Sequence, residues 1–181
     1  MSGGIARVIR LAVLAAWVGF GALAPRADAA LLGQRSLPEF RQPRLEDGLA
    51  WDSANLRGHV ALVILWAPWC TICMAEWPDL VALYQRLSPS GLRCVALTMD
   101  APADAADRKD LAQRLDLPFP VVSGDDGLRR RFRGVRGYPT LVLADRDGTI
   151  RHQWAGPPPT GELEAAIRNL LRSDHAEGHP G

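Results

Sequence analysis

The chain has 181 residues, of which 48% are hydrophobic, and a formal net charge of +1 at pH 7. This length and apolar content suffice for one domain with a sizeable core, and the near-neutral charge gives no reason to expect a nucleic-acid partner. Its 3 cysteines are too few for a fold held together by disulfides, which favours a chemical role for any cysteine pair.

The first 29 residues have the pattern of a secretory signal peptide. Arg7 and Arg10 form a basic start, an apolar stretch follows over 11–23, and residues 27–29 offer a cleavage site with small side chains. The apolar stretch is shorter than the ~20 residues that span a bilayer, so an uncleaved membrane anchor is the weaker alternative. We therefore expect an exported, periplasmic protein.

The first half of the mature chain predicts a buried strand followed by a helix. An extended lead-in is expected over 37–40 and a turn with a short capped helical piece over 51–58. The continuous apolar run over 60–66 is typical of a central strand that is buried on both faces. Leucines then recur at helical spacing, which predicts a helix over about 70–87 that bends at Pro78.

The second half alternates strands with helices. The expected elements are a strand over 92–98, a helix over 103–115, a short strand over 120–122, a short helix over 128–132, a strand over 140–144, a hairpin turn over 145–148, its partner strand over 149–154 and an amphipathic helix from Leu163 to Leu171. This order predicts a three-layer α/β domain. We expect the domain over residues 30–172 and a polar, disordered tail over 173–181.

Cys70 and Cys73 stand where the buried strand gives way to the helix. Free backbone N–H groups and the helix dipole stabilise a thiolate at a helix N-terminus. We therefore expect Cys70 to be a nucleophile and Cys73 to be the less exposed, resolving thiol. Cys94 falls within a strand pattern and is expected to be a small buried core residue.

Metal binding is the main alternative use of this cysteine pair. A zinc site would need further ligands, but the sequence has no second cysteine pair and no histidines at a matching spacing. Copper(I) binding by the two thiolates, as in a copper chaperone, remains open. The pattern expected around a peroxidatic cysteine, Pro-x-x-x-Thr-x-x-Cys, is absent. We expect no metal and no cofactor.

Three motifs together resemble the thioredoxin fold. They are Trp69-Cys70-Thr71-Ile72-Cys73, then Tyr138-Pro139-Thr140 at the start of a strand, then Asp147-Gly148 in a hairpin. More narrowly, the chain is similar to the exported TlpA/ResA-like thiol-disulfide oxidoreductases from about Leu37 to Leu171. The resemblance implies a three-layer α/β/α thioredoxin fold with a central mixed β-sheet.

The resemblance also implies a set of site residues. Pro139 matches the cis-proline of the family, beside the dithiol, and Tyr138 before it would bind substrate through its backbone. Trp69 would pack around the dithiol and contact substrate. Glu76 matches an acidic residue of the specialised branch; it lies three residues beyond Cys73, on the same helical face, and could exchange a proton with that thiol.

The implied function is that of a protein disulfide reductase which acts on selected partners. Candidate substrates are apocytochrome c and copper-site assembly proteins, with a membrane-embedded reductase as the electron donor and the protein itself a monomer. A periplasmic thiol oxidant is the nearest alternative. The Thr71-Ile72 pair leaves this open, because Cys-x-x-Cys proteins span roughly 150 mV, or about 7 kcal/mol.

Five arginines crowd a short stretch before Pro139. They are Arg129, Arg130, Arg131, Arg133 and Arg136. Such a run is usually a solvated face of a protein. The alternative is that it borders the active site and steers an acidic partner, since a positive rim raises encounter rates at low salt.

Overall fold

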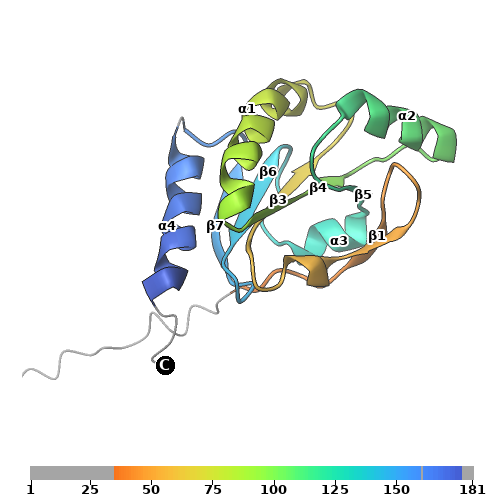
Figure 1. Cartoon of the computed structure of the whole chain (residues 1–181). Coiled ribbons are helices and arrows are strands. Elements are labelled where there is room, and N and C mark those ends of the chain that lie inside the picture. Colours follow the sequence, from red (N-terminus) through yellow and green to blue (C-terminus); the bar gives the residue numbers. More distant parts are fainter. Residues whose placement is uncertain (1–34, 160, 177–181) are drawn as a thin grey trace, which may run out of the picture. The chain divides into compact units, whose positions relative to one another are not determined.

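The computed structural model describes residues 35–159 and 161–176 (Figure 1). The expected signal peptide lies outside these residues, as does the end of the expected tail. Within the described part of the chain, no helix is both long and apolar enough to cross a membrane.

A five-stranded mixed sheet forms the centre of the domain. Its strands are β3 (Val60–Trp66), β4 (Leu92–Thr98), β5 (Val121–Ser123), β6 (Thr140–Ala144) and β7 (Ile150–Ala155). Their order is β5-β4-β3-β6-β7, with β4 parallel to β3, β5 parallel to β4, and both other pairs antiparallel. Every residue of β3 is buried, which confirms the central strand predicted from its unbroken apolar run.

Helices cover both faces of this sheet (Figure 1). They are α1 (Thr71–Leu87), α2 (Ala105–Leu115), α3 (Asp126–Arg131) and α4 (Glu162–Ala176), with short 3₁₀ turns η1 (Ser53–Leu56) and η2 (Ser88–Ser90). Alternate residues of β3 face opposite layers: Leu62 and Ile64 pack with α1 and α4, whereas Val63 packs on the side of α3. The predicted three-layer α/β/α thioredoxin fold is confirmed, and each large buried side chain contributes roughly 1.5–3 kcal/mol.

One pair of strands and several boundaries differ from the sequence-based expectation; α3, for example, covers Asp126–Arg131 rather than 128–132. Strands β1 (Arg41–Pro43) and β2 (Ala50–Asp52) pair antiparallel as a small separate sheet. They were not predicted, because three-residue strands with exposed ends carry too little periodicity. Helix α2 begins at Ala105 rather than 103, since Asp104 caps it. Helix α4 continues to Ala176, so the first residues of the expected disordered tail are helical.

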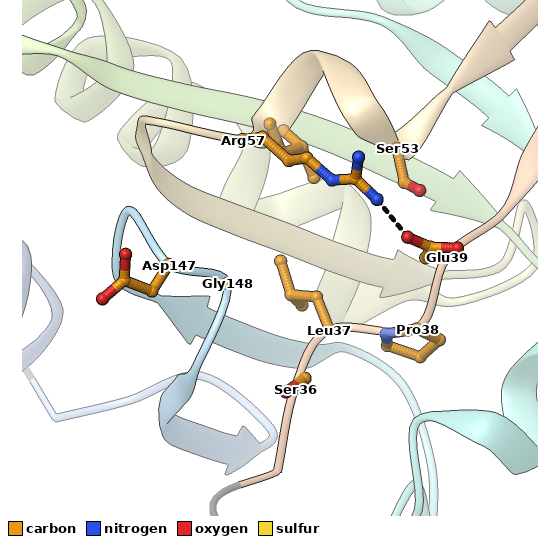
Figure 2. A pocket seen from close by; sticks show the side chains of 9 residues that line it. Ser36, Leu37, Pro38, Glu39, Ser53, Arg57, Asp147 and Gly148 are labelled. Atoms are coloured by element: carbon orange, nitrogen blue, oxygen red, sulfur yellow. Dashed lines mark hydrogen bonds and ion pairs between the residues drawn. The ribbon is translucent and has the colours of Figure 1, made fainter.

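The lead-in segment attaches to the hairpin between β6 and β7. The Leu37 N–H donates to the Gly148 carbonyl at 2.8 Å, and the Ile150 N–H donates to the Arg35 carbonyl at 2.6 Å. Beside this contact lies a hollow of about 250 Å³, which the ion pair between Glu39 and Arg57 borders (Figure 2). No cysteine lines the hollow, so it is separate from the redox site.

Candidate active site

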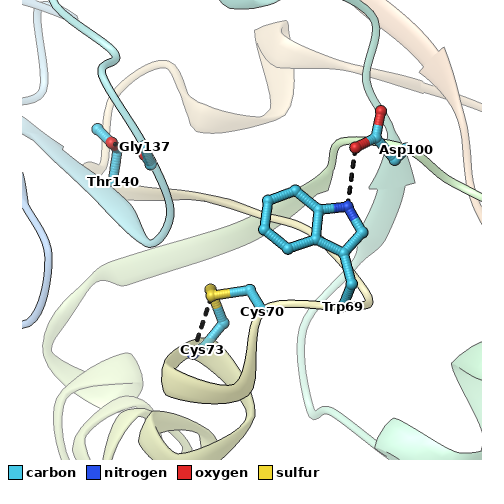
Figure 3. The surroundings of a disulfide bond; sticks show 6 residues. All are labelled: Trp69, Cys70, Cys73, Asp100, Gly137 and Thr140. Atoms are coloured by element: carbon cyan, nitrogen blue, oxygen red, sulfur yellow. Dashed lines mark hydrogen bonds between the residues drawn. A yellow bond between two sulfur atoms is a disulfide. The ribbon is translucent and has the colours of Figure 1, made fainter.

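Cys70 and Cys73 form a disulfide, with an S–S distance of 2.06 Å and a Cα–Cα distance of 5.2 Å. Cys70 caps α1, and its sulfur accepts the Cys73 N–H at 3.1 Å (Figure 3). Strand β3 ends four residues earlier, so the strand delivers the pair to the helix start. In the reduced protein this N–H and the positive end of α1 would stabilise a negative charge on the Cys70 sulfur.

Three exposed apolar side chains stand next to the disulfide cysteines in the chain and are here called the apolar collar. The collar consists of Trp69, Ile72 and Met74, which are 66%, 56% and 42% exposed. Among the described residues, Leu49 is the only other large hydrophobic side chain that is exposed. Apolar side chains gathered at a surface are typical of protein contact sites. Sequence reasoning named Trp69 but missed Ile72 and Met74 as contact residues, because the helical pattern alone does not locate the surface around the disulfide.

Trp69 is held on two sides. Its indole N–H donates to the Asp100 carboxylate at 2.9 Å (Figure 3). Its ring lies 5.8 Å from the Tyr138 ring, at 60°. Asp100 has a left-handed backbone conformation, with φ of 57°, just after β4. Sequence reasoning missed Asp100, since only the pairing of β3 with β4 brings it next to Trp69.

The peptide bond between Tyr138 and Pro139 is cis, as the resemblance implied. The Pro139 carbonyl accepts the Gly156 N–H at 2.7 Å, and the Thr140 hydroxyl donates to the Gly137 carbonyl at 2.7 Å. The first bond connects the cis-proline turn to the residue that follows β7. The second connects Thr140, at the start of β6, to Gly137 at the beginning of the turn. Because the Tyr138 ring contacts Trp69, the turn lies beside the disulfide. Burial raises the pKa of the Tyr138 hydroxyl.

Glu76 lies on α1, one turn beyond Cys73, and is half-buried. It lines a groove of about 540 Å³ together with Asp79 and the prolines at 157–159. No hydrogen bond or ion pair joins its carboxylate to another described residue in this oxidised form. Glu76 therefore borders the groove and lies on the same helix as the resolving cysteine.

Behind the disulfide the layer between sheet and helices is apolar. Trp66 and Trp77 pack edge to face, with ring centroids 5.2 Å apart, and Ile64 on β3 is buried. Cys94 is a free, buried thiol on β4, and burial raises its pKa. The predicted core role of Cys94 is confirmed. Over residues 35–159 and 161–176, no cluster of three or more His, Cys, Asp and Glu residues is arranged for a metal ion.

Comparison with known proteins gives one family match over most of the domain. The family model described as AhpC/TSA matches residues 34–153. The chain is 28% identical to the thiol-disulfide oxidoreductase ResA of Bacillus cereus over 91% of this chain and 94% of that protein. It is 32% identical to the thiol:disulfide interchange protein DsbE of Pseudomonas aeruginosa, covering 71% of this chain and 68% of that one.

A solved structure shares the same architecture. A thiol:disulfide interchange protein of the thioredoxin family from Chlorobium tepidum superposes with a TM-score of 0.67 and 25% identity. The match covers 80% of this chain and 99% of that one. Sequence and structure comparisons therefore agree on one class of redox protein.

Proposed function

Because the chain belongs to the AhpC/TSA family and is a thiol-disulfide oxidoreductase of the ResA and DsbE type, we propose that it reduces disulfides of selected exported proteins. The observation that carries this proposal is the Cys70–Cys73 disulfide at the cap of α1, with the exposed residues of the apolar collar next to it in the chain. A general reductant of small molecules would not need such a collar, whereas a protein-specific one gains affinity from it.

The proposed reaction begins from the reduced protein. The Cys70 thiolate attacks one sulfur of the partner disulfide, and the other partner sulfur leaves and takes up a proton. Cys73 then loses its proton to the Glu76 carboxylate and attacks the Cys70 sulfur. The partner leaves with its second thiol, two electrons richer, and the Cys70–Cys73 disulfide described above is the product.

Substrate binding would use the collar and the cis-proline turn. Trp69 and Tyr138 form an aromatic wall against which apolar side chains of the partner would pack. The backbone of Tyr138 would bind an extended segment of the partner, in the manner of an added strand. The role of Pro139 is to shape this turn, so that the segment passes over the disulfide.

The partners belong to the same proposal. The substrates would be apocytochrome c or copper-site assembly proteins, and a membrane-embedded reductase would return the protein to its dithiol form. Export through the signal peptide at residues 1–29 would place the protein in the periplasm. The two substrate classes share a disulfide between cysteines that must be free before haem or copper is inserted.

Trapping tests the proposal directly. A Cys73→Ala variant should accumulate a mixed disulfide through Cys70, and mass spectrometry of the captured protein identifies the substrate. Cys70→Ser is the matched control and should capture nothing. A reduction potential near about −270 mV supports a reductant, and one near about −120 mV would make the protein an oxidant. A reactive Cys70 that captures no protein would contradict the proposal.

A further inference from the structure

Five arginines, here called the arginine rim, lie on α3 and on the loop that leads to the cis-proline turn. They are Arg129, Arg130, Arg131, Arg133 and Arg136. From Gly127 to Pro139 the chain has five of its 21 Lys and Arg residues and none of its 20 Asp and Glu residues, which leaves 16 against 20 elsewhere. Although the net charge of the chain is only +1, its positive charge is concentrated in this segment and the rest of the chain is net negative.

The rim borders the redox site. The Asp126 carboxylate, bonded at 2.9 Å, raises the pKa of Arg129, and Tyr138 and Asp100 act on it in the same direction. Tyr138 and Asp100 both contact Trp69, the residue before Cys70, so Arg129 acts on the same group of residues that flanks the disulfide. Arg136 is two residues before Tyr138 in the chain. The rim therefore begins beside the residues that flank the disulfide, and Arg136 leads directly into the cis-proline turn.

The members of the rim differ in what they bind. Arg129 pairs with Asp126, and Arg131 donates to the Glu39 carbonyl. Arg133 and Arg136 are exposed and form no ion pair with any residue in the described part of the chain.

The loop that presents these two arginines is anchored. The Gln153 side chain donates to the Arg133 carbonyl at 2.9 Å, which ties the loop to β7. Arg133 itself has a left-handed backbone conformation, with φ of 45°, and Gly134 follows with φ of 69°. Because the backbone is already placed, binding an anion here would cost less conformational entropy than on a free loop.

We propose that Arg133 and Arg136 bind an acidic segment of the substrate protein, close to the disulfide that is exchanged. The inference rests on the proposed reductase function and names the chemical class of its partner. A cavity of about 510 Å³ beside Tyr138 is lined by Asp100, Asp125 and Asp126, together with Arg108. These carboxylates would repel the same segment, so the charge pattern also sets the orientation in which the partner docks.

Synthetic peptides with one internal disulfide can test this. Three peptides would differ only in the residues that flank the cysteines, which are Glu, Gln or Lys. The reduced protein is mixed with each peptide, and the change in total tryptophan fluorescence, calibrated by mass spectrometry of quenched samples, reports oxidation of the dithiol. At ~0.01 M salt the Glu peptide should react about tenfold faster than the Lys peptide, and at ~1 M salt the two rates should converge, because the Debye length falls from ~30 Å to ~3 Å.

Matched double variants assign the effect to the rim. Arg133→Gln with Arg136→Gln should lower the preference for the Glu peptide at least about threefold. Arg93→Gln with Arg172→Gln removes the same charge at the far ends of β4 and α4 and should leave the preference intact. A preference that survives in the rim variant, or rates equal for Glu and Lys peptides, would overturn the inference. If no peptide of any charge oxidised the dithiol, the proposed function itself would fail.

Discussion

The indole N–H of Trp69 donates a hydrogen bond to the carboxylate of Asp100 at 2.9 Å, across 31 residues of sequence. This bond fixes an exposed ring beside the disulfide and against Tyr138. A tryptophan that is 66% exposed would otherwise sample several rotamers and lose entropy whenever a partner packs on it. Asp100 is therefore a positioning residue for the aromatic wall.

Removing that acceptor should slow the reaction with protein disulfides. Asp100→Gly deletes the carboxylate and tolerates the left-handed backbone, and we expect a loss of about threefold to tenfold, equivalent to the roughly 0.5–1.5 kcal/mol of one hydrogen bond. Reduction of a small disulfide reagent should be unchanged. Asp100→Asn keeps an acceptor oxygen and suits the same backbone, so it should behave as wild type; equal losses in both variants would remove Asp100 from this role.

Glu76→Gln should prolong the mixed disulfide. If the carboxylate takes the Cys73 proton, its loss slows resolution by about tenfold or more while the first attack by Cys70 is unaffected. Rapid acid quenching followed by mass spectrometry separates the two steps. Asp79→Asn, in the same groove, is the matched control. A resolution rate that is the same in both variants would show that water alone accepts the proton.

Cys94 should be inert in the folded protein. Because burial raises its pKa, iodoacetamide at neutral pH should modify Cys70 in the reduced protein and leave Cys94 untouched until the chain is unfolded. Cys94→Ser would place a hydroxyl in the apolar layer and should cost about 1–3 kcal/mol of unfolding free energy. Cys94→Ala adds no polar group and should retain redox activity; modification of native Cys94 would contradict its core placement.

His59 should make the fold less stable as the pH falls. Burial, with further contributions from Arg93 and Arg146, lowers its pKa below the ordinary 6.5, so the unfolded chain takes up the proton first. Stability present above about pH 6.5 is therefore lost progressively as the pH drops toward the lowered pKa. Urea denaturation at pH 7.5 and 5.5 tests this: His59→Gln should lose less stability over that interval than wild type, and an identical loss would contradict the assignment.

Local sequence patterns predicted most of the fold. The unbroken apolar run of β3 favoured a strand buried on both faces, and the leucine spacing of α1 indicated one buried helical side. The pattern that identifies each of these two elements lies within a few neighbouring residues of the sequence. Strands β1 and β2 were not predicted, because they are stabilised mainly by pairing with each other. Three residues are also too few to show the alternation of apolar and polar side chains that marks a strand.

The sequence by itself determined that a dithiol begins a helix after a buried strand, since Cys70, Cys73 and the apolar run are contiguous. The sequence also shows the arginine rim directly, because five arginines and no acidic residue stand between Gly127 and Pro139. Only the tertiary structure decided what surrounds the sulfurs. Pairing of β3 with β4 brings Asp100 to Trp69, and the antiparallel β6 brings Tyr138 to the same place. These contacts are long-range, so no local spacing encodes them, and they determine which partners can reach the disulfide.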